Sequence, residues 1–518
     1  MAFVSILNDV MGPVMRGPSS SHTAGAYRIA LLVKMLAGDA PARVRVAFDP
    51  DGSYAPTYRP LGVDLAFAAA ILGWEMTDDR YDDALTEIAK AGIDLSFVVE
   101  PLENPTHPND ALIRYETPGG DAMTARARSV GGGVVEVYEV NGSACMIDGK
   151  SWAVLATVDG RRADDVARDA SEILGAAEPV KSDGAQIQWN LNGAVTPDSL
   201  SGVEAVEGVR RVRVSEPVMF TRGGDELFTS GTEMVSLARE RGWSLGRTAL
   251  AYESRLLGMP EAELVTEMLR RYEVMCASVE RGLDDKRVSL AYLRPSAAAL
   301  MRAEAEGRLP VGGMGARAVA RGLAALHVSN SRGVVCAAPT GGAAGVIPGV
   351  VVTLAEERGL AGERLASALF AASAVGLAMA RRATFAAEEA GCQVEIGVAG
   401  AMAAAAVVDS AGGKAEEAAS AASIALQNTI GLVCDPVGGG CEIPCHTRTA
   451  VAITGAFTCA DLAMGGYANP IPLDDAVDAS YAAGRALPSE LRCTALGGVA
   501  VTPSALKLVR DSSHEQEA

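Results

Sequence analysis

Small apolar residues at helical spacing dominate the second half of the chain. From about residue 230 to residue 510, apolar side chains recur every three or four positions, as in ELVTEMLRRYEVMCASVERGL and ERLASALFAASAVGLAMARRA. Alanine-rich stretches such as VAGAMAAAAVVDSA lack the bulk that holds helices apart. This pattern predicts an all-α domain over residues 230–510, built from buried and closely packed helices.

The first part of the chain has a different pattern. Up to about residue 148, strand-like runs (ARVRVAFD, LSFVVEPL, VVEVYEVN) alternate with helix-like runs (GAYRIALLVKMLAG, GVDLAFAAAILG). This alternation predicts a mixed α/β domain over residues 1–148. The fold class that we expect is therefore a multi-domain α+β protein.

A smaller unit is predicted between these two regions, over residues 149–217. SWAVLATV, GAQIQWNL and VRRVRVSEPV are strand-like, with helix-like segments between them. This order resembles the small α+β ACT domain. Val158-Asp159-Gly160-Arg161 stands where that module usually has Asp-x-Pro-Gly, so we do not expect the usual mode of ligand binding.

The charge of the chain limits its partners. The 64 acidic and 45 basic residues among 518 give a formal net charge of −19, which repels phosphate backbones and anionic lipids. The N-terminal MAFVSILNDVMGPVMRG has no basic segment typical of an export signal. The longest uncharged run, residues 334–355, contains two prolines and predicts a buried loop before a helix. We therefore expect a cytoplasmic protein that binds neither nucleic acid nor membrane.

Most of the nine cysteines lie in the predicted helical region. Three of them fall in GLVCDPVGGGCEIPCHTR, where glycine and proline break any helix and thiols can converge. Spacing alone leaves a metal site and simple packing open, because no C-x₂-C framework occurs and free cysteines are often buried. A zinc site from Cys441, Cys445 and His446 fits no common spacing. A nucleophilic cysteine would have to use His327 or His446, and no lysine lies in a motif typical of pyridoxal phosphate enzymes.

Seven motifs, taken in chain order, carry a family resemblance. They are MRGPSSSHTAGAYRIA, THPND, SVGGG, CAAPTGGAAGVIPG, AEEAGCQVEIG, GLVCDPVGGGCEIPCHTR and CTALGGVAVTP. With them the chain resembles the iron–sulfur-dependent L-serine dehydratases (L-serine ammonia-lyases) over nearly its whole length. The β-type part precedes the α-type part, as if two subunits had been fused. The resemblance implies a homodimer that uses a [4Fe-4S] cluster to convert L-serine, or a related β-hydroxy amino acid, into pyruvate or another 2-oxo acid and ammonia.

The resemblance also implies the ligands of the cluster. The family cysteines of the GCQ, CDP and PC motifs correspond to Cys392, Cys434 and Cys445. Cys441 stands at a position that is usually apolar and is taken as a neighbour, and a contact from Cys493 is left open. Some members carry a further cysteine at the extreme C-terminus, where this chain ends in Glu-Gln-Glu-Ala. Three ligands leave one iron open to act as a Lewis acid on the leaving hydroxyl group.

The resemblance turns several polar loops into candidate substrate sites. His22 is the candidate proton carrier, since imidazole titrates near neutral pH, with Ser20 and Ser21 as its catalytic neighbours. Taken alone, a serine run before a helix is often only an N-cap, His-Pro-Asn is good turn chemistry, and a glycine-rich loop is a tight helix entry. The substrate-binding candidates are Ser19, Thr23, His107, Asn109, Asn330, Pro339, Thr340 and Gly342.

Two departures from the family pattern affect the expected substrate. Leu61 and Val63 stand where related sequences usually have histidine and threonine, so this part of the site is more apolar. The reaction type is therefore better defined than the amino acid. Two alternatives remain open: elimination of sulfide from cysteine, and a non-enzymatic iron–sulfur redox sensor. A sensor would not need the polar loops of the first region.

Overall fold

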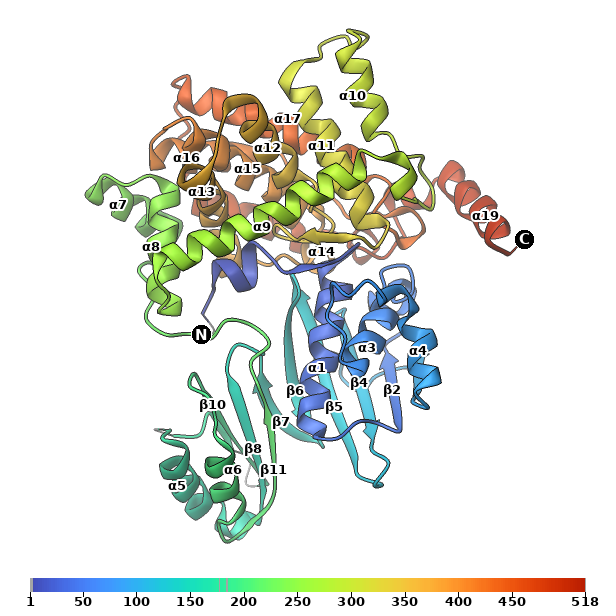
Figure 1. Ribbon diagram of the computed structural model, residues 1–518, viewed down its shortest axis with the longest axis vertical. Helices are drawn as coiled ribbons and strands as arrows, with labels where there is room; N and C mark the ends of the chain where they lie inside the picture. Colours follow the sequence, from blue (N-terminus) through green and yellow to red (C-terminus); the bar gives the residue numbers. More distant parts are fainter. Residues whose placement is uncertain (1–2, 177, 183–184, 518) are drawn as a thin grey trace.

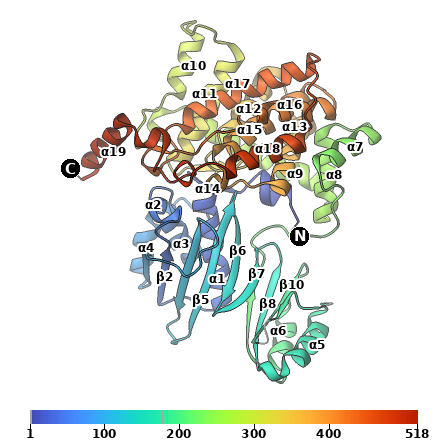
Figure 2. The same ribbon diagram turned by 180° about the vertical axis from the view of Figure 1, so that it is seen from behind.

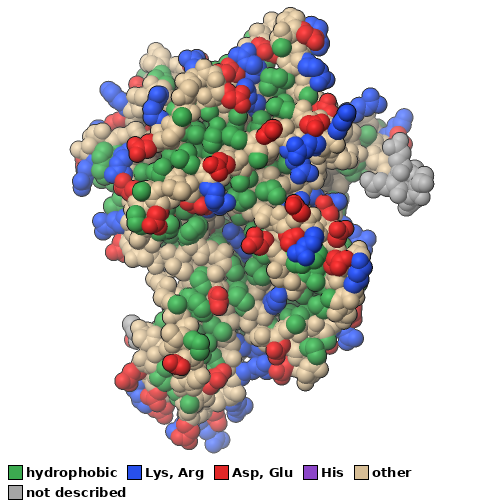
Figure 3. All heavy atoms as spheres, viewed as in Figure 1, with side chains coloured by type: hydrophobic (Ala, Val, Ile, Leu, Met, Phe, Trp, Pro, Cys, Tyr) green, Lys and Arg blue, Asp and Glu red, His purple; other side chains and the backbone are tan. Residues whose placement is uncertain are grey.

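The computed structural model describes residues 3–176, 178–182 and 185–517. A large helical region lies above two β-containing regions in the orientation of Figure 1, and Figure 2 shows the same arrangement from behind. Charged side chains of both signs are interspersed over the face seen in Figure 3. The mixed α/β composition with a helical C-terminal region agrees with the predicted fold class.

A six-stranded sheet forms the centre of the first region. Its order is β3-β2-β4-β5-β6-β7, with β2 and β3 parallel and the other neighbours antiparallel. Met123, Ala125 and Ala127 of β5 are buried while the residues between them are not, because successive side chains of a strand point to opposite faces. Helices α1 and α3 pack together, and α1 contacts β5 and β6. The elements are α1 (Gly25–Ala37), β2 (Arg43–Phe48), α2 (Tyr54–Thr57), α3 (Val63–Leu72), α4 (Ala84–Lys90), β3 (Asp94–Val99), β4 (Asp110–Glu116), β5 (Ala122–Gly131), β6 (Val134–Val140) and β7 (Ser143–Ile147).

The middle region is a separate antiparallel sheet of order β11-β8-β10-β9. Its chain order is βαββαβ, with one short strand more than the sequence predicted. Trp189, fully buried between sheet and helices, is the largest side chain of its small core, and its ring N–H donates to Ser171 Oγ (2.9 Å). The elements are β8 (Trp152–Val158), α5 (Ala163–Leu174), β9 (Lys181–Ser182), β10 (Gln186–Leu191), α6 (Pro197–Glu204) and β11 (Val209–Ser215).

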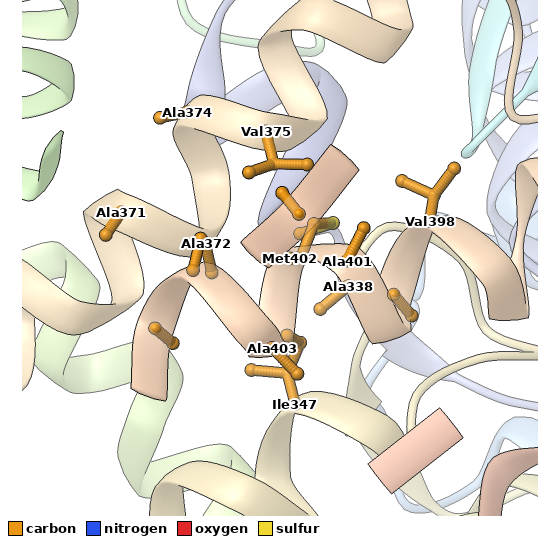
Figure 4. Close-up of a cluster of buried hydrophobic side chains, with 14 of the residues drawn as sticks. Ala338, Ile347, Ala371, Ala372, Ala374, Val375, Val398, Ala401, Met402 and Ala403 are labelled. Carbon is orange, nitrogen blue, oxygen red and sulfur yellow. The ribbon is translucent and has the colours of Figure 1, made fainter. Parts of the chain in front are cut away.

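The helical region is built around α15, which packs against α13, α16 and α17. Figure 4 shows why these helices approach closely: their contacts are made largely by alanine side chains, with Val375, Val398 and Met402 between them. A Cβ on Gly246 of α8 would overlap the carbonyl oxygen of Ser367 in α13. The elements are α7 (Gly231–Arg241), α8 (Leu245–Leu257), α9 (Glu261–Gly282), α10 (Ala297–Ala305), α11 (Gly313–Asn330), α12 (Val346–Arg358), α13 (Gly362–Arg382), α14 (Ala387–Ala390), α15 (Ile396–Ser410), α16 (Ala415–Gln427), α17 (Cys445–Met464), α18 (Leu473–Arg485) and α19 (Pro503–Glu517).

Two helical segments, Gly362–Arg382 and Cys392–Ser410, are long and apolar enough to cross a membrane by length and composition. In the structure, 78% and 83% of their most apolar windows are buried inside the protein. The packing of the helical core accounts for their composition.

The helical region is not entirely α-helical, which corrects the prediction. Strand β12 (Val334–Cys336) pairs antiparallel with β1 (Val14–Arg16) from the N-terminus. Just before β1, the π-helical turn Ile6–Val10 contacts α13. The buried carboxylate of Glu253 in α8 accepts hydrogen bonds from the start of this turn. Residues 5–16 therefore pack into the helical region.

Candidate active site

The hydroxyl-rich loop forms a buried turn at the start of α1. Ser20–Ala24 is a single π-helical turn, and Ser19 caps it by accepting a hydrogen bond from the backbone N–H of His22 (3.3 Å). The four residues after Ser19 are buried. The Thr23 hydroxyl donates to the carbonyl oxygen of Leu61 (3.0 Å). Ser19 therefore is an N-cap, and Ser19 and Thr23 hold the loop in place.

A glycine-containing loop of the helical region packs directly on this turn. The backbone N–H of Gly341 donates to Ser20 Oγ (3.2 Å), which leaves the Ser20 hydroxyl hydrogen able to donate elsewhere. A Cβ on Gly341 would lie 2.9 Å from the carbonyl oxygen of Pro18, so a side chain there would push the loops apart. The hydroxyl of Tyr54 donates to the carbonyl oxygen of Ser21 (3.0 Å) and fixes the turn from the other side.

The rest of the same loop faces the interior. A Cβ on Gly342 would lie 3.7 Å from Glu395 Oε2 and 3.8 Å from Cys441 Sγ, so the backbone of Gly342 borders both groups. Thr340 is fully buried, and its hydroxyl accepts from the Ala343 N–H (3.2 Å). Pro339 lies beside the SVGGG turn of the first region, since a Cβ on Gly132 would be 3.7 Å from its carbonyl oxygen.

His22 is held by both ring nitrogens. Thr57 donates its hydroxyl hydrogen to the Ser53 carbonyl, so His22 Nε2 is the donor in the 2.9 Å contact with Thr57 Oγ1. Nδ1 is then an acceptor for the Ser19 hydroxyl (3.0 Å). Burial lowers the pKa of His22 to about 3, so the imidazole is neutral at physiological pH.

The THPN loop reaches the helical region through an acidic pair. Because the Asn109 N–H donates to His107 Nδ1 (3.0 Å), His107 Nε2 is the donor to Glu389 Oε1 (2.9 Å). This bond holds the pKa of Glu389 below its usual value. Asn109 is fully buried and donates through Nδ2 to Glu388 Oε1 (3.2 Å).

Glu388 is a site residue that was not predicted from the sequence. This carboxyl group lies 3.6 Å from His22 Nδ1 and contacts Asn109, so it links the two polar loops. Burial raises the pKa of Glu388. The only local signal was two adjacent acidic residues in the apolar stretch FAAEEAGC.

The three predicted ligand cysteines come together. Cys392 lies in a short helical turn after α14, Cys434 follows α16, and Cys445 begins α17. The Sγ atoms of Cys392 and Cys434 and a carboxylate oxygen of Glu395 lie within 4.8 Å of one another. Cys445 is coupled electrostatically to Cys392 and to Glu395. All three thiols are buried, and no sulfur of the chain is in a disulfide.

Two further thiols extend this group. Cys493 forms a hydrogen bond with the Cys434 thiol, and Cys441 with the Cys445 thiol. Backbone bonds hold Cys493 beside Cys434, because its N–H donates to the Cys434 carbonyl (2.9 Å), and its φ of 61° is in the left-handed region. The hydroxyl of Ser53 in the first region donates to the Cys493 carbonyl (3.3 Å).

The donor set fits a metal centre of sulfur ligands. The hydrogen bond to Cys434 and burial raise the pKa of Cys392, and the hydrogen bond to Cys441 and burial do the same for Cys445. Thiols this crowded stay protonated until a cation stabilises their thiolates. Arg448 is the nearby cationic side chain, and Asp435 holds its guanidinium (2.8 Å).

Asn330 lies on the outer side of the thiols. Its amide donates to the Cys441 carbonyl (2.9 Å) and contacts His446 Nε2 (2.8 Å). It lines a cavity of about 520 Å³ between the two regions, together with Pro18 and Cys441. A larger cavity, of about 780 Å³, lies between α15 and α17 and has Arg448 in its wall. We associate the first cavity with the polar loops, because both regions contribute to its wall.

Leu61 and Val63 are both buried. Leu61 takes part in the site through its carbonyl oxygen, the acceptor for Thr23, and not through its side chain. Whether the two aliphatic side chains change the choice of substrate stays a prediction.

Comparison with known proteins places this site in a family. The model of the family described as serine dehydratase alpha chain matches residues 188–500. The "Probable L-serine dehydratase, alpha chain" of Bacillus subtilis is 34% identical over 282 residues, which cover 54% of this chain and 94% of that protein. The corresponding "beta chain" of the same organism is 40% identical over 147 residues, 28% of this chain and 65% of that protein. The "L-serine dehydratase" of Streptomyces coelicolor is 34% identical over 285 residues, 53% of this chain and 61% of that protein.

The matched range contains all three predicted ligand cysteines and Glu388. These relatives carry the names of lyases, and the chain resembles both an alpha and a beta chain. The chain therefore belongs to the serine dehydratase family of enzymes.

Proposed function

We propose that this chain eliminates water from L-serine, or from a closely related β-hydroxy amino acid, and releases a 2-oxo acid and ammonia. The main support for the proposal is that the buried hydroxyl-rich loop lies close to the thiols of the helical region. Gly341 and Gly342 connect the two, since Gly341 is bonded to Ser20 and Gly342 borders Glu395 and Cys441. The dehydratase names of the relatives support the same reaction and do not favour sulfide release or a redox sensor.

We propose further that Cys392, Cys434 and Cys445 hold a [4Fe-4S] cluster. When bound, the cluster would supply a Lewis acid that polarises the bond between the β-carbon and its hydroxyl group. The three proposed ligands and Cys493 are buried, whereas Cys441 is half-buried and borders the cavity, so water would reach the iron only from that side. Cys441 and Cys493 each contact a proposed ligand and stay neighbours in this assignment.

The polar loops would bind and orient the amino acid. Ser20 has a free hydroxyl hydrogen to donate to a carboxylate, while Ser19 and Thr23 keep the turn rigid. His22 remains our candidate proton carrier and would start from its neutral form. Loss of the α-proton and of hydroxide yields aminoacrylate, which tautomerises to an imine and hydrolyses to the 2-oxo acid and ammonia.

Three further proposals concern the whole protein. The middle sheet with its βαββαβ order is proposed to be an ACT-like module. The functional unit is proposed to be a cytoplasmic homodimer that acts on a small amino acid. Domain boundaries at residues 1–148, 149–217 and 230–510 stay a prediction.

The test of the reaction is anaerobic purification followed by iron and sulfide analysis and a substrate panel on one sample. We expect about four iron and four sulfide per chain. L-serine or L-threonine should give 2-oxo acid and ammonia, faster than L-cysteine gives sulfide. No 2-oxo acid from any β-hydroxy amino acid, with the cluster intact, would reject the proposal.

Replacing one proposed ligand cysteine tests whether the cluster is needed for activity, and a second buried cysteine controls for an effect on folding. Cys392→Ser should lose both the visible absorbance of the cluster and turnover, because serine is a poor iron ligand. Cys459→Ser is the matched control, since Cys459 is also buried but burial alone raises its pKa, with no neighbouring thiol. A Cys392→Ser protein that is metal-free and fully active would contradict the assignment.

A further inference from the structure

Two buried acceptor atoms of the site have no hydrogen-bond partner among the described residues. They are Glu388 Oε2 and Asn109 Oδ1, on side chains that are 5% and 0% exposed. An unpartnered buried acceptor costs stability, and buried polar groups are nearly always paired. Two of them on contacting residues point to a ligand that donates hydrogen bonds.

The orientation of both side chains is fixed by their other contacts. Asn109 Nδ2 donates to Glu388 Oε1 (3.2 Å), and the carbonyl oxygen of Ser129 is 3.5 Å from the same nitrogen. Glu388 Oε1 is thus engaged inside the site, while Glu388 Oε2 and Asn109 Oδ1 remain available to a ligand.

Glu388 has no lysine or arginine partner among the described residues, and its one ion-pair neighbour, His22, is neutral. Glu388 lies in α14, directly before the turn that carries Cys392. The position therefore favours a positive ligand beside the thiols.

We propose that Glu388 and Asn109 form the subsite that receives the α-ammonium group of the amino-acid substrate. An ammonium group carries three N–H donors and one positive charge, and the subsite offers two free acceptors and one negative charge. The inference rests on the proposed function and adds the group that distinguishes an amino acid from a simple carboxylic acid.

The experiment compares two ligands that differ only in the amino group and cannot eliminate water. L-alanine and propionate are titrated calorimetrically into anaerobic holoenzyme. Wild type should bind L-alanine more tightly. Glu388→Gln should weaken L-alanine about 10- to 100-fold and leave propionate unchanged. For L-serine turnover, KM should rise by a similar factor with a smaller change in kcat.

Glu253→Gln is the matched control, because Glu253 is also a buried carboxylate but both its oxygens accept hydrogen bonds. It should keep the preference for L-alanine. If Glu388→Gln does not fold with its cluster, Glu388→Asp takes its place and should weaken L-alanine alone. Equal weakening of both ligands, or a loss of kcat at unchanged KM, would overturn the proposal. A wild type that neither binds L-alanine nor converts L-serine would instead reject the proposed function.

Discussion

The buried side chain of His22 makes the free energy of unfolding depend on pH. Its pKa is about 3 in the folded chain, against about 6.5 when unfolded. Below pH 6.5 the unfolded chain takes up a proton that the folded chain does not, so the free energy of unfolding falls as the pH drops from about 6.5 towards 3, by about 1.4 kcal/mol per pH unit. His22→Asn removes this contribution. The stability advantage of wild type over the variant should therefore shrink by about 2 kcal/mol between pH 7 and pH 5 in urea unfolding. An unchanged difference would mean that folded His22 accepts the proton.

At the residue scale, the sequence predicted which polar residues meet but not how they are bonded. Motif order predicted His22 and His107 as site residues and Cys392, Cys434 and Cys445 as cluster ligands, and these roles stay predictions. It could not show that Ser19 is used as a cap or that Thr23 is bonded to Leu61, because these contacts depend on the turn geometry. Glu388 was missed because its place in the site depends on a hydrogen bond from Asn109, which lies 279 positions earlier in the chain.

Close packing between helices depends on glycine at several crossings, and that of α8 with α13 is one of them. A Cβ on Gly246 would overlap the Ser367 carbonyl oxygen, and a backbone atom cannot move aside cheaply. Gly246→Ala should therefore lower the free energy of unfolding by about 1–3 kcal/mol. Gly455→Ala in α17 is the control, because a Cβ there meets no atom within 4 Å, and it should be neutral or stabilising by up to about 1 kcal/mol. Thermal unfolding of both variants checks this, and equal losses would contradict it.

At the scale of the elements, the periodicity of apolar residues predicted the long helices well but did not reveal strands of two or three residues. The helices of residues 230–510 and strands β2, β3 and β6 of the first sheet follow from their apolar patterns, whereas β4, β5 and β7 were not predicted. Strand β12 was missed because three residues have no detectable period, and its partner β1 is about 320 positions earlier. The two-residue β9 was missed for the same reason of length.

At the scale of the whole molecule, one buried ion pair connects all three regions. Asp9 lies in the N-terminal turn that packs on α13. Lys150 lies between β7, the last strand of the six-stranded sheet along the chain, and β8, the first strand of the four-stranded sheet. Lys150 Nζ is 2.7 Å from Asp9 Oδ1, and both side chains are 5% exposed. Since the polar loops and the thiols come from different regions, contacts of this kind hold the two halves of the site in register.

Removing one charge of this pair should be far more costly than removing one from a surface pair. Asp9→Asn leaves a buried ammonium group without its partner and should lower the free energy of unfolding by about 3–5 kcal/mol. Asp94→Asn breaks the exposed pair between Arg43 and Asp94, whose side chains are 57% and 61% exposed, and should leave the free energy of unfolding almost unchanged. Denaturant unfolding of the two variants, with the absorbance of the proposed cluster recorded in the same titration, measures both effects. If the two substitutions cost the same, the regions are held together by apolar packing, and Asp9–Lys150 has no special part in aligning the loops with the thiols.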